Sequence, residues 1–159
     1  MNIFTVSLFG HRKIDCSRQL SHQLTLTIQR PVQEKPYTSF LIGRNGEFDE
    51  YAASVIKCVQ HRVGKENSDI SLVLPYSVAN CKYYEAYYDN IIIPENVSGA
   101  HPKSAITFKN RWMVEQSDLV IVYIERNNGG AYTAMKYAEK LNKRIIRINT
   151  NENIGYSDK

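Results

Sequence analysis

The sequence contains only three cysteines among its 159 residues, and none of them forms a CxxC pair. Cys16, Cys58 and Cys81 therefore predict neither a disulfide framework nor a zinc site, and they fit the reducing environment of the cytoplasm. We accordingly expect a cytoplasmic protein, and no motif indicates a bound metal or a cofactor.

Long apolar runs are absent as well. No stretch approaches the length that spans a bilayer, so we expect no association with a membrane. The first ten residues lack a basic region followed by a long apolar stretch, and no signal peptide is expected. The chain is long enough for one domain with a core, which we place at residues 1–149, before a polar tail at 150–159.

Runs of lysine or arginine are also missing. The 20 basic and 16 acidic residues leave a net charge of +4, and the basic residues are scattered along the chain. This mild excess is compatible with an anionic small molecule, and it is weak evidence for nucleic acid. The sequence therefore argues against nucleic acid as a partner.

What the sequence does contain is a strand, a glycine loop and a helix in succession. Residues 119–124 are a short apolar run rich in β-branched side chains, which is typical of a strand buried on both faces. Gly129 and Gly130 follow, and then apolar residues recur at helical spacing. Such loops lie at the carboxyl ends of parallel strands, where open α/β sheets bind ligands, and their N–H groups suit an anion such as phosphate.

Strands and helices alternate along the rest of the chain. This alternation predicts a Rossmann-like α/β domain of three layers, with a mostly parallel sheet covered by helices on both faces. Pro31 and Pro36 are expected to bracket a connector after the first helix. The expected strands are residues 3–9, 38–42, 70–74, 91–93, 119–124 and 144–148, and the expected helices include 17–30, 48–59 and 105–116.

Four polar segments are expected to meet in one groove at the carboxyl edge of this sheet. Glycine permits a tight turn and the close approach of a ligand, and arginine binds a phosphate through two nitrogens. The candidate ligand-binding residues in these segments are Gly10, His11, Arg12, Gly43, Arg44, Asn45, Gly46, Glu47, Asn110, Arg111, Gly129, Gly130 and Thr133.

Several of these segments also have purely structural explanations. Asp49 is expected in a first helical turn, where N-capping explains it as well as chemistry does. Arg111 is explained equally by pairing with a surface carboxylate, and Phe48 by packing in the core. The catalytic residue, if the protein has one, stays unknown; Glu47 and Asp49 are the candidates, because a carboxylate binds ribose hydroxyls or acts on a water.

Together these segments resemble the SLOG superfamily, a Rossmann-like group that includes DprA and the LOG phosphoribohydrolases, and within it the YpsA-like branch. The resemblance covers residues 6–148 and rests on GHR at 10–12, GRNGEFDEYAA at 43–53, NRWMVEQSDLVIVY at 110–123 and GGAYTAMKYA at 129–138. It implies a nucleotide-derived ligand lying across the glycine loops. A DNA-binding role such as that of DprA ranks lower, because the sequence shows no basic stripe.

One motif departs from the pattern of the LOG enzymes. Of their PGGxGTxxE pattern, the chain keeps Gly129, Gly130 and Thr133 and replaces the other positions by Asn128, Tyr132 and Lys136. A lysine in place of the final glutamate cannot stabilise an oxocarbenium-like centre or act as the same base. We therefore predict a protein that binds or senses a nucleotide or an ADP-ribose-like ligand.

Two further hypotheses stay open. The first is an N-glycoside hydrolase or transferase acting on a nucleotide, with Glu47 as the best single carboxylate ahead of Asp49 and Glu125. The second is a protein-interaction module that uses the tyrosine-rich residues 83–88 as its docking surface. Apolar residues at 83–88 and 108–112 also lead us to expect a homodimer or a larger homo-oligomer.

Overall fold

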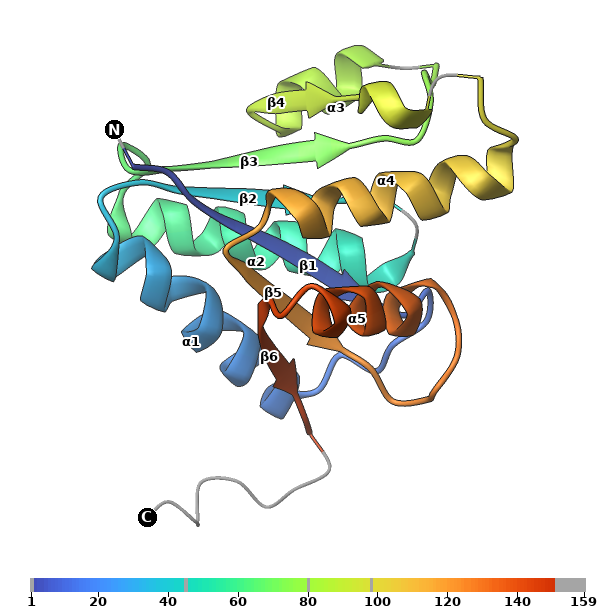
Figure 1. The fold of residues 1–159 in the computed structure, drawn as a ribbon. Helices are drawn as coiled ribbons and strands as arrows, with labels where there is room; N and C mark the ends of the chain where they lie inside the picture. The colour runs from blue at the N-terminus through green and yellow to red at the C-terminus, as the bar shows by residue number, and fades with distance from the viewer. Residues whose placement is uncertain (1, 45, 80, 98, 151–159) are drawn as a thin grey trace.

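The computed structural model describes residues 2–44, 46–79, 81–97 and 99–150. Within them, six parallel strands form one sheet in the order β4-β3-β2-β1-β5-β6, and helices cover both of its faces (Figure 1). This confirms the three-layer α/β fold predicted from the sequence. In chain order the elements are β1 (Phe4–Gly10), α1 (Arg18–Glu34), β2 (Thr38–Ile42), α2 (Glu47–Val63), β3 (Ser68–Val73), α3 (Cys81–Tyr87), β4 (Asn90–Ile92), a 3₁₀ turn (Glu95–Val97), α4 (Pro102–Gln116), β5 (Leu119–Tyr123), α5 (Gly130–Lys140) and β6 (Arg144–Ile148).

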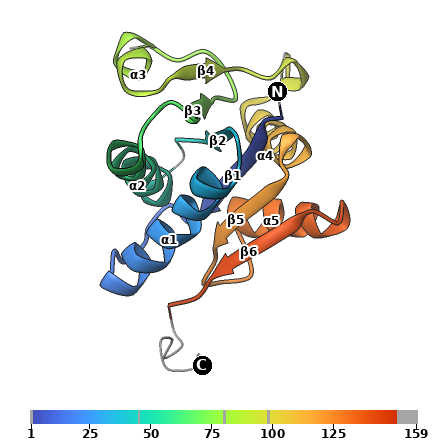
Figure 2. The same ribbon diagram turned by 90° about the vertical axis from the view of Figure 1, so that its left-hand side faces the viewer.

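The two faces of the sheet carry separate hydrophobic cores. Helices α1 and α2 pack side by side on one face, where Ile56 of α2 joins Leu8 of β1 in one buried cluster. Helices α4 and α5 pack on the opposite face, where Met135 of α5 joins Val122 of β5 (Figure 2). The strands in the middle of the sheet are therefore buried on both sides, which explains their continuous apolar runs.

Strand β1 lies inside the sheet between β2 and β5, where the direction of winding reverses. The chain proceeds from β1 outward to β4, then returns across the opposite face and continues through β5 to β6. The loops that leave β1 and β5 consequently lead to helices on opposite faces. A crevice opens between such loops at the carboxyl edge, and it is the usual ligand site of open parallel sheets.

Helix α1 differs from the sequence-based prediction at its C-terminal end. Pro31 was expected to open a connector, but the helix includes it and continues to Glu34. Pro31 and Val32 are both buried, and the carbonyl of Pro31 accepts hydrogen bonds from the N–H of Lys35 and the hydroxyl of Thr38. Burial of two apolar side chains offsets the one helical hydrogen bond that the proline removes.

The first two loops of the carboxyl edge are packed directly on each other. A Cβ atom added to Gly46 would clash with the Cα of Arg12, and one added to Gly10 would clash with the buried ring of Phe48. The backbone N–H of Glu47 donates to the carbonyl of Arg12 over 2.7 Å. Glycine is required at both positions, because only a residue without a Cβ allows this approach.

None of the helices formed by the described residues combines the length and the apolar character needed to cross a bilayer. The tail predicted at 150–159 lies, from residue 151 onward, outside the described residues.

Candidate functional site

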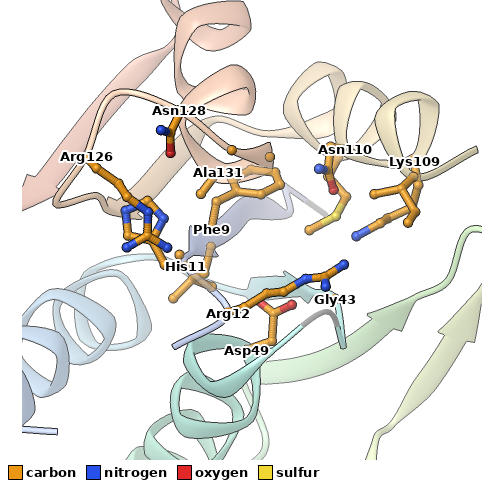
Figure 3. Close-up of a pocket in the computed structure, with 16 residues that line it drawn as sticks. Phe9, His11, Arg12, Gly43, Asp49, Lys109, Asn110, Arg126, Asn128 and Ala131 are labelled. Atoms are coloured by element: carbon orange, nitrogen blue, oxygen red, sulfur yellow. The ribbon is translucent and has the colours of Figure 1, made fainter. Parts of the chain in front are cut away.

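A cavity of about 280 Å³ lies at the carboxyl edge of the sheet, in the crevice where β1 and β5 end. The loops after β1 and β2, the loop before α5 and one side of α4 enclose it (Figure 3). Gly10, Gly43, Asn110 and Gly129 all line it, so each of the four predicted segments reaches the same groove.

Three cationic side chains surround the cavity, and each comes from a different part of the fold. Arg12 follows β1, Lys109 lies on α4, and Arg126 lies in the loop between β5 and α5 (Figure 3). Among the described residues that line the cavity, Asp49 of α2 is the one carboxylate. The recess therefore carries an excess of positive charge, and its walls screen that charge less than open water does. This is the electrostatic setting that binds a phosphate.

Lys109 is the most unusual of the three cations, because its side chain is only 1% exposed. Burial lowers the pKa of Lys109 from 10.5 to about 8, and the nearby carboxylate of Asp49 opposes that shift. Figure 3 shows the side chain directed from α4 into the cavity. A buried ammonium group is costly to maintain, so an anion that enters the cavity gains a partner whose hydration has already been removed.

His11 fixes the loop that carries Arg126. Its Nε2 accepts a hydrogen bond of 2.9 Å from the backbone N–H of Glu125, which requires the proton to be on Nδ1. Burial lowers the pKa of His11 below 6.5, the positive charge of Arg126 lowers it further, and the carboxylate of Glu125 partly opposes both effects. The neutral imidazole therefore holds the β5–α5 loop against the β1 end.

This arrangement predicts a pH dependence of stability with a defined sign. The pKa of His11 is lower in the folded chain than in the unfolded chain, so the unfolded chain takes up the proton first as the pH falls. The contribution of His11 to the free energy of unfolding should therefore be constant above about pH 6.5, and it should decrease as the pH falls below that value. In His11→Gln, whose carbonyl oxygen accepts the same N–H without titrating, urea denaturation should show a smaller difference between pH 7 and pH 5. An identical difference in both proteins would contradict this role.

Asn110 adds a neutral polar group to the cavity wall. Its side chain is buried, and its Oδ1 has no hydrogen-bond donor among the described residues. A buried acceptor without a partner costs about 1–3 kcal/mol. A phosphate offers acceptors only, whereas nucleobase edges carry N–H donors. The unused acceptor therefore favours a ligand that brings a base as well as a phosphate.

The cavity collects most of the predicted ligand-binding residues, but not all of them. Asn45 lies outside the described residues. Glu47, the preferred catalytic candidate, points elsewhere: its carboxylate accepts the N–H of Ile14 over 2.9 Å and thereby braces the β1–α1 loop. The predicted residues at the cavity are Gly10, His11, Arg12, Gly43, Asn110, Gly129 and Gly130, together with the catalytic candidate Asp49; those that do not line it are Arg44, Gly46, Glu47, Arg111 and Thr133.

A second groove continues from the cavity between α4 and α5. The two hollows share Ile106, Asn110 and Gly130. The groove holds about 440 Å³, and Arg111 and Thr133 line it together with basic residues of α5. Both predicted residues thus lie beside the cavity rather than in it.

Sequence reasoning missed Lys109 and Arg126. A signal for Lys109 was present, because the residue stands four positions after Ala105 and four before Met113, on the buried stripe of α4. A lysine is almost never fully buried unless its charge is paired, so its place on an apolar stripe is a signal. Arg126 carried no comparable signal, since it is one of several polar residues that follow β5.

Comparison with known proteins identifies the fold. No protein-family model matches the sequence, and no curated protein matches it. The X-ray structure of DNA processing protein A (DprA) from Streptococcus pneumoniae matches with a TM-score of 0.69 and 18% sequence identity, over 98% of this chain and 54% of that one. DprA from Helicobacter pylori, which binds single-stranded DNA, matches with a TM-score of 0.64 and 14% identity, over 94% of this chain and 67% of that one. The chain has the Rossmann-like three-layer fold of these neighbours, and it spans about half the length of the first.

These neighbours correct two expectations. The H. pylori protein binds single-stranded DNA. This finding contradicts the expectation of a small nucleotide-derived ligand, and it contradicts the expectation that nucleic acid is not a partner. The hydrolase and the protein-docking alternatives gain no support from either neighbour. The physical reason for the error is that charge was sought as a run in the sequence. Arg12, Lys109 and Arg126 are far apart in the chain, and only the fold assembles them.

Proposed function

We propose that this chain binds single-stranded DNA, with the strand's phosphates held in the cavity at the carboxyl edge of the sheet. The observation that carries this proposal is the convergence of Arg12, Lys109 and Arg126 on one recess beside Gly129 and Gly130. The likeness to DprA, of which the H. pylori protein binds single-stranded DNA, supports it.

The shape of the site favours a single strand over a duplex. Lys109 lies at a buried wall of the recess rather than on a convex surface. A flexible single strand can bend one phosphate into such a recess, whereas a stiff duplex keeps its phosphates on the outside of a cylinder. The unpaired bases of a single strand also present free N–H donors, which suit the unused acceptor of Asn110.

The experiment that tests the proposal is fluorescence anisotropy with a labelled thymidine oligomer and with a duplex of equal length, at several salt concentrations. We expect saturable binding of the single strand and much weaker binding of the duplex. Each phosphate neutralised on a single strand changes the slope of log K against log salt by about −0.7, so the three cations of the cavity alone contribute about −2. Absence of single-strand binding at low salt would refute the proposal.

Several finer assignments are part of the proposal as well. We assign the chain to the YpsA-like branch of the SLOG-type fold and to the cytoplasm, in keeping with its three free thiols. We also propose that residues 1–149 act as one domain and that the protein is a homodimer or a larger homo-oligomer.

A further inference from the structure

Tyr83 and Tyr84 of α3, together with Tyr88 directly after it, form a connected column of rings that runs from the surface to the core. Tyr83 is 68% exposed, and its ring meets that of Tyr84 edge to face, with the centroids 5.4 Å apart. Tyr84 in turn packs against Tyr88, which is buried, at 6.4 Å. Buried Tyr88 lies close enough to Asp49 of the cavity for that carboxylate to raise the pKa of its hydroxyl, although burial is the larger cause.

Arg44 joins this column to the cavity. The residue directly follows Gly43, which lines the cavity, and its guanidinium lies over the ring of Tyr84 at 5.4 Å from the centroid. Arg44 is exposed, so its charge faces solvent beside the ring. A cation and an exposed aromatic surface therefore continue outward from the carboxyl edge of the sheet.

We infer that Tyr83 and Tyr84 form a base-stacking platform, on which a single strand lays the bases next to the phosphate held in the cavity. This inference rests on the proposed function and adds a subsite to it. Arg44 binds the strand's backbone between the two subsites. The occupant is a nucleobase, because an exposed aromatic ring stacks with a base and an adjacent cation binds a phosphate. The ring and the cation lie side by side here, as a base and its phosphate do along a strand.

The packing of the rings against one another supports a role in stacking, rather than a chance group of exposed tyrosines. Each ring of the column contacts another, Tyr83 included, and Tyr88 anchors the column in the hydrophobic core. Stacking on a ring that is already immobilised loses little side-chain entropy. An exposed tyrosine without such support would offer a base a far weaker surface.

The test compares two strands of about 12 nucleotides, one of thymidines and one in which abasic sugars replace most of the nucleosides, by fluorescence anisotropy. Stacking contributes enough per base that Tyr83→Leu should weaken binding of the thymidine strand by roughly 5-fold or more. Binding of the abasic strand should not change, since its backbone is the same. Tyr83→Phe, which keeps the ring, should bind both strands as the wild type does, and so should Leu26→Ala, an exposed apolar residue of α1 outside the site.

A spectroscopic readout separates stacking from a structural effect. A strand carrying 2-aminopurine should lose fluorescence on binding to the wild type and to Tyr83→Phe, and lose less on binding to Tyr83→Leu. If Tyr83→Leu binds thymidines as tightly as the wild type, or if both strands weaken equally, the platform is refuted while the proposed function stands. If the wild type binds neither strand, the proposed function itself has failed.

Discussion

Replacing both Arg12 and Arg126 by alanine should weaken the binding of single-stranded DNA by on the order of 100- to 1,000-fold. A charge-assisted hydrogen bond to a phosphate contributes about 1.5–3 kcal/mol, and every 1.4 kcal/mol is tenfold in affinity. The two effects need not add, because both side chains line one cavity. Both are exposed, so the fold should survive the change, and anisotropy titration against a thymidine oligomer measures the loss.

A matched pair of arginines serves as the control. Arg30 and Arg144 line a separate hollow where α1 ends and β6 begins, away from the carboxyl edge. The variant with both of these replaced by alanine has the same net charge as the test variant and should bind like the wild type. The salt slope should fall by about 1.4 only when Arg12 and Arg126 are lost. Equal weakening in both variants would mean that net charge, not the cavity, binds the strand.

The sheet could be predicted because its signals are local. Residues 119–124 are apolar throughout because β5 is covered on both faces. Such a continuous apolar run can be recognised from the local sequence alone, without knowing which strands pair with it. The glycines at 10, 43 and 129 follow strands directly, and parallel strands bring their carboxyl ends to one edge. The parallel arrangement of the strands therefore places these loops beside one groove.

The site could be predicted only in part because its charges are assembled by tertiary structure. Glu47 and Asp49 stand two positions apart in one helical turn, yet only Asp49 faces the cavity while Glu47 binds the N–H of Ile14. Consecutive helical residues point in different directions, and the sequence does not state which direction meets the crevice. The same holds for Lys109, whose burial depends on how α4 packs across the sheet.

Lys109→Met should stabilise the free protein while weakening its binding of DNA. In the folded chain the pKa of Lys109 is about 8, against 10.5 in the unfolded chain, so the charged form costs up to about 3 kcal/mol of folding free energy below pH 8. Asp49 attracts the ammonium group and raises the pKa of Lys109, so the value of about 8 already includes that attraction. Methionine has nearly the same shape and no charge. Urea denaturation at pH 7 should therefore show a more stable variant, and the gain should shrink as the pH rises from 8 to 10.5.

The loss of binding is the second half of the same prediction. Without the ammonium group, the phosphate loses one charge-assisted bond, and affinity for a thymidine oligomer should fall about 10- to 100-fold at pH 7. Lys103→Met removes an exposed lysine from the first turn of the same helix and should change neither quantity appreciably. A variant of Lys109 that is less stable and binds as tightly as the wild type would make Lys109 a structural partner of Asp49. A more stable variant with weaker binding shows that this chain keeps a costly buried charge for its ligand.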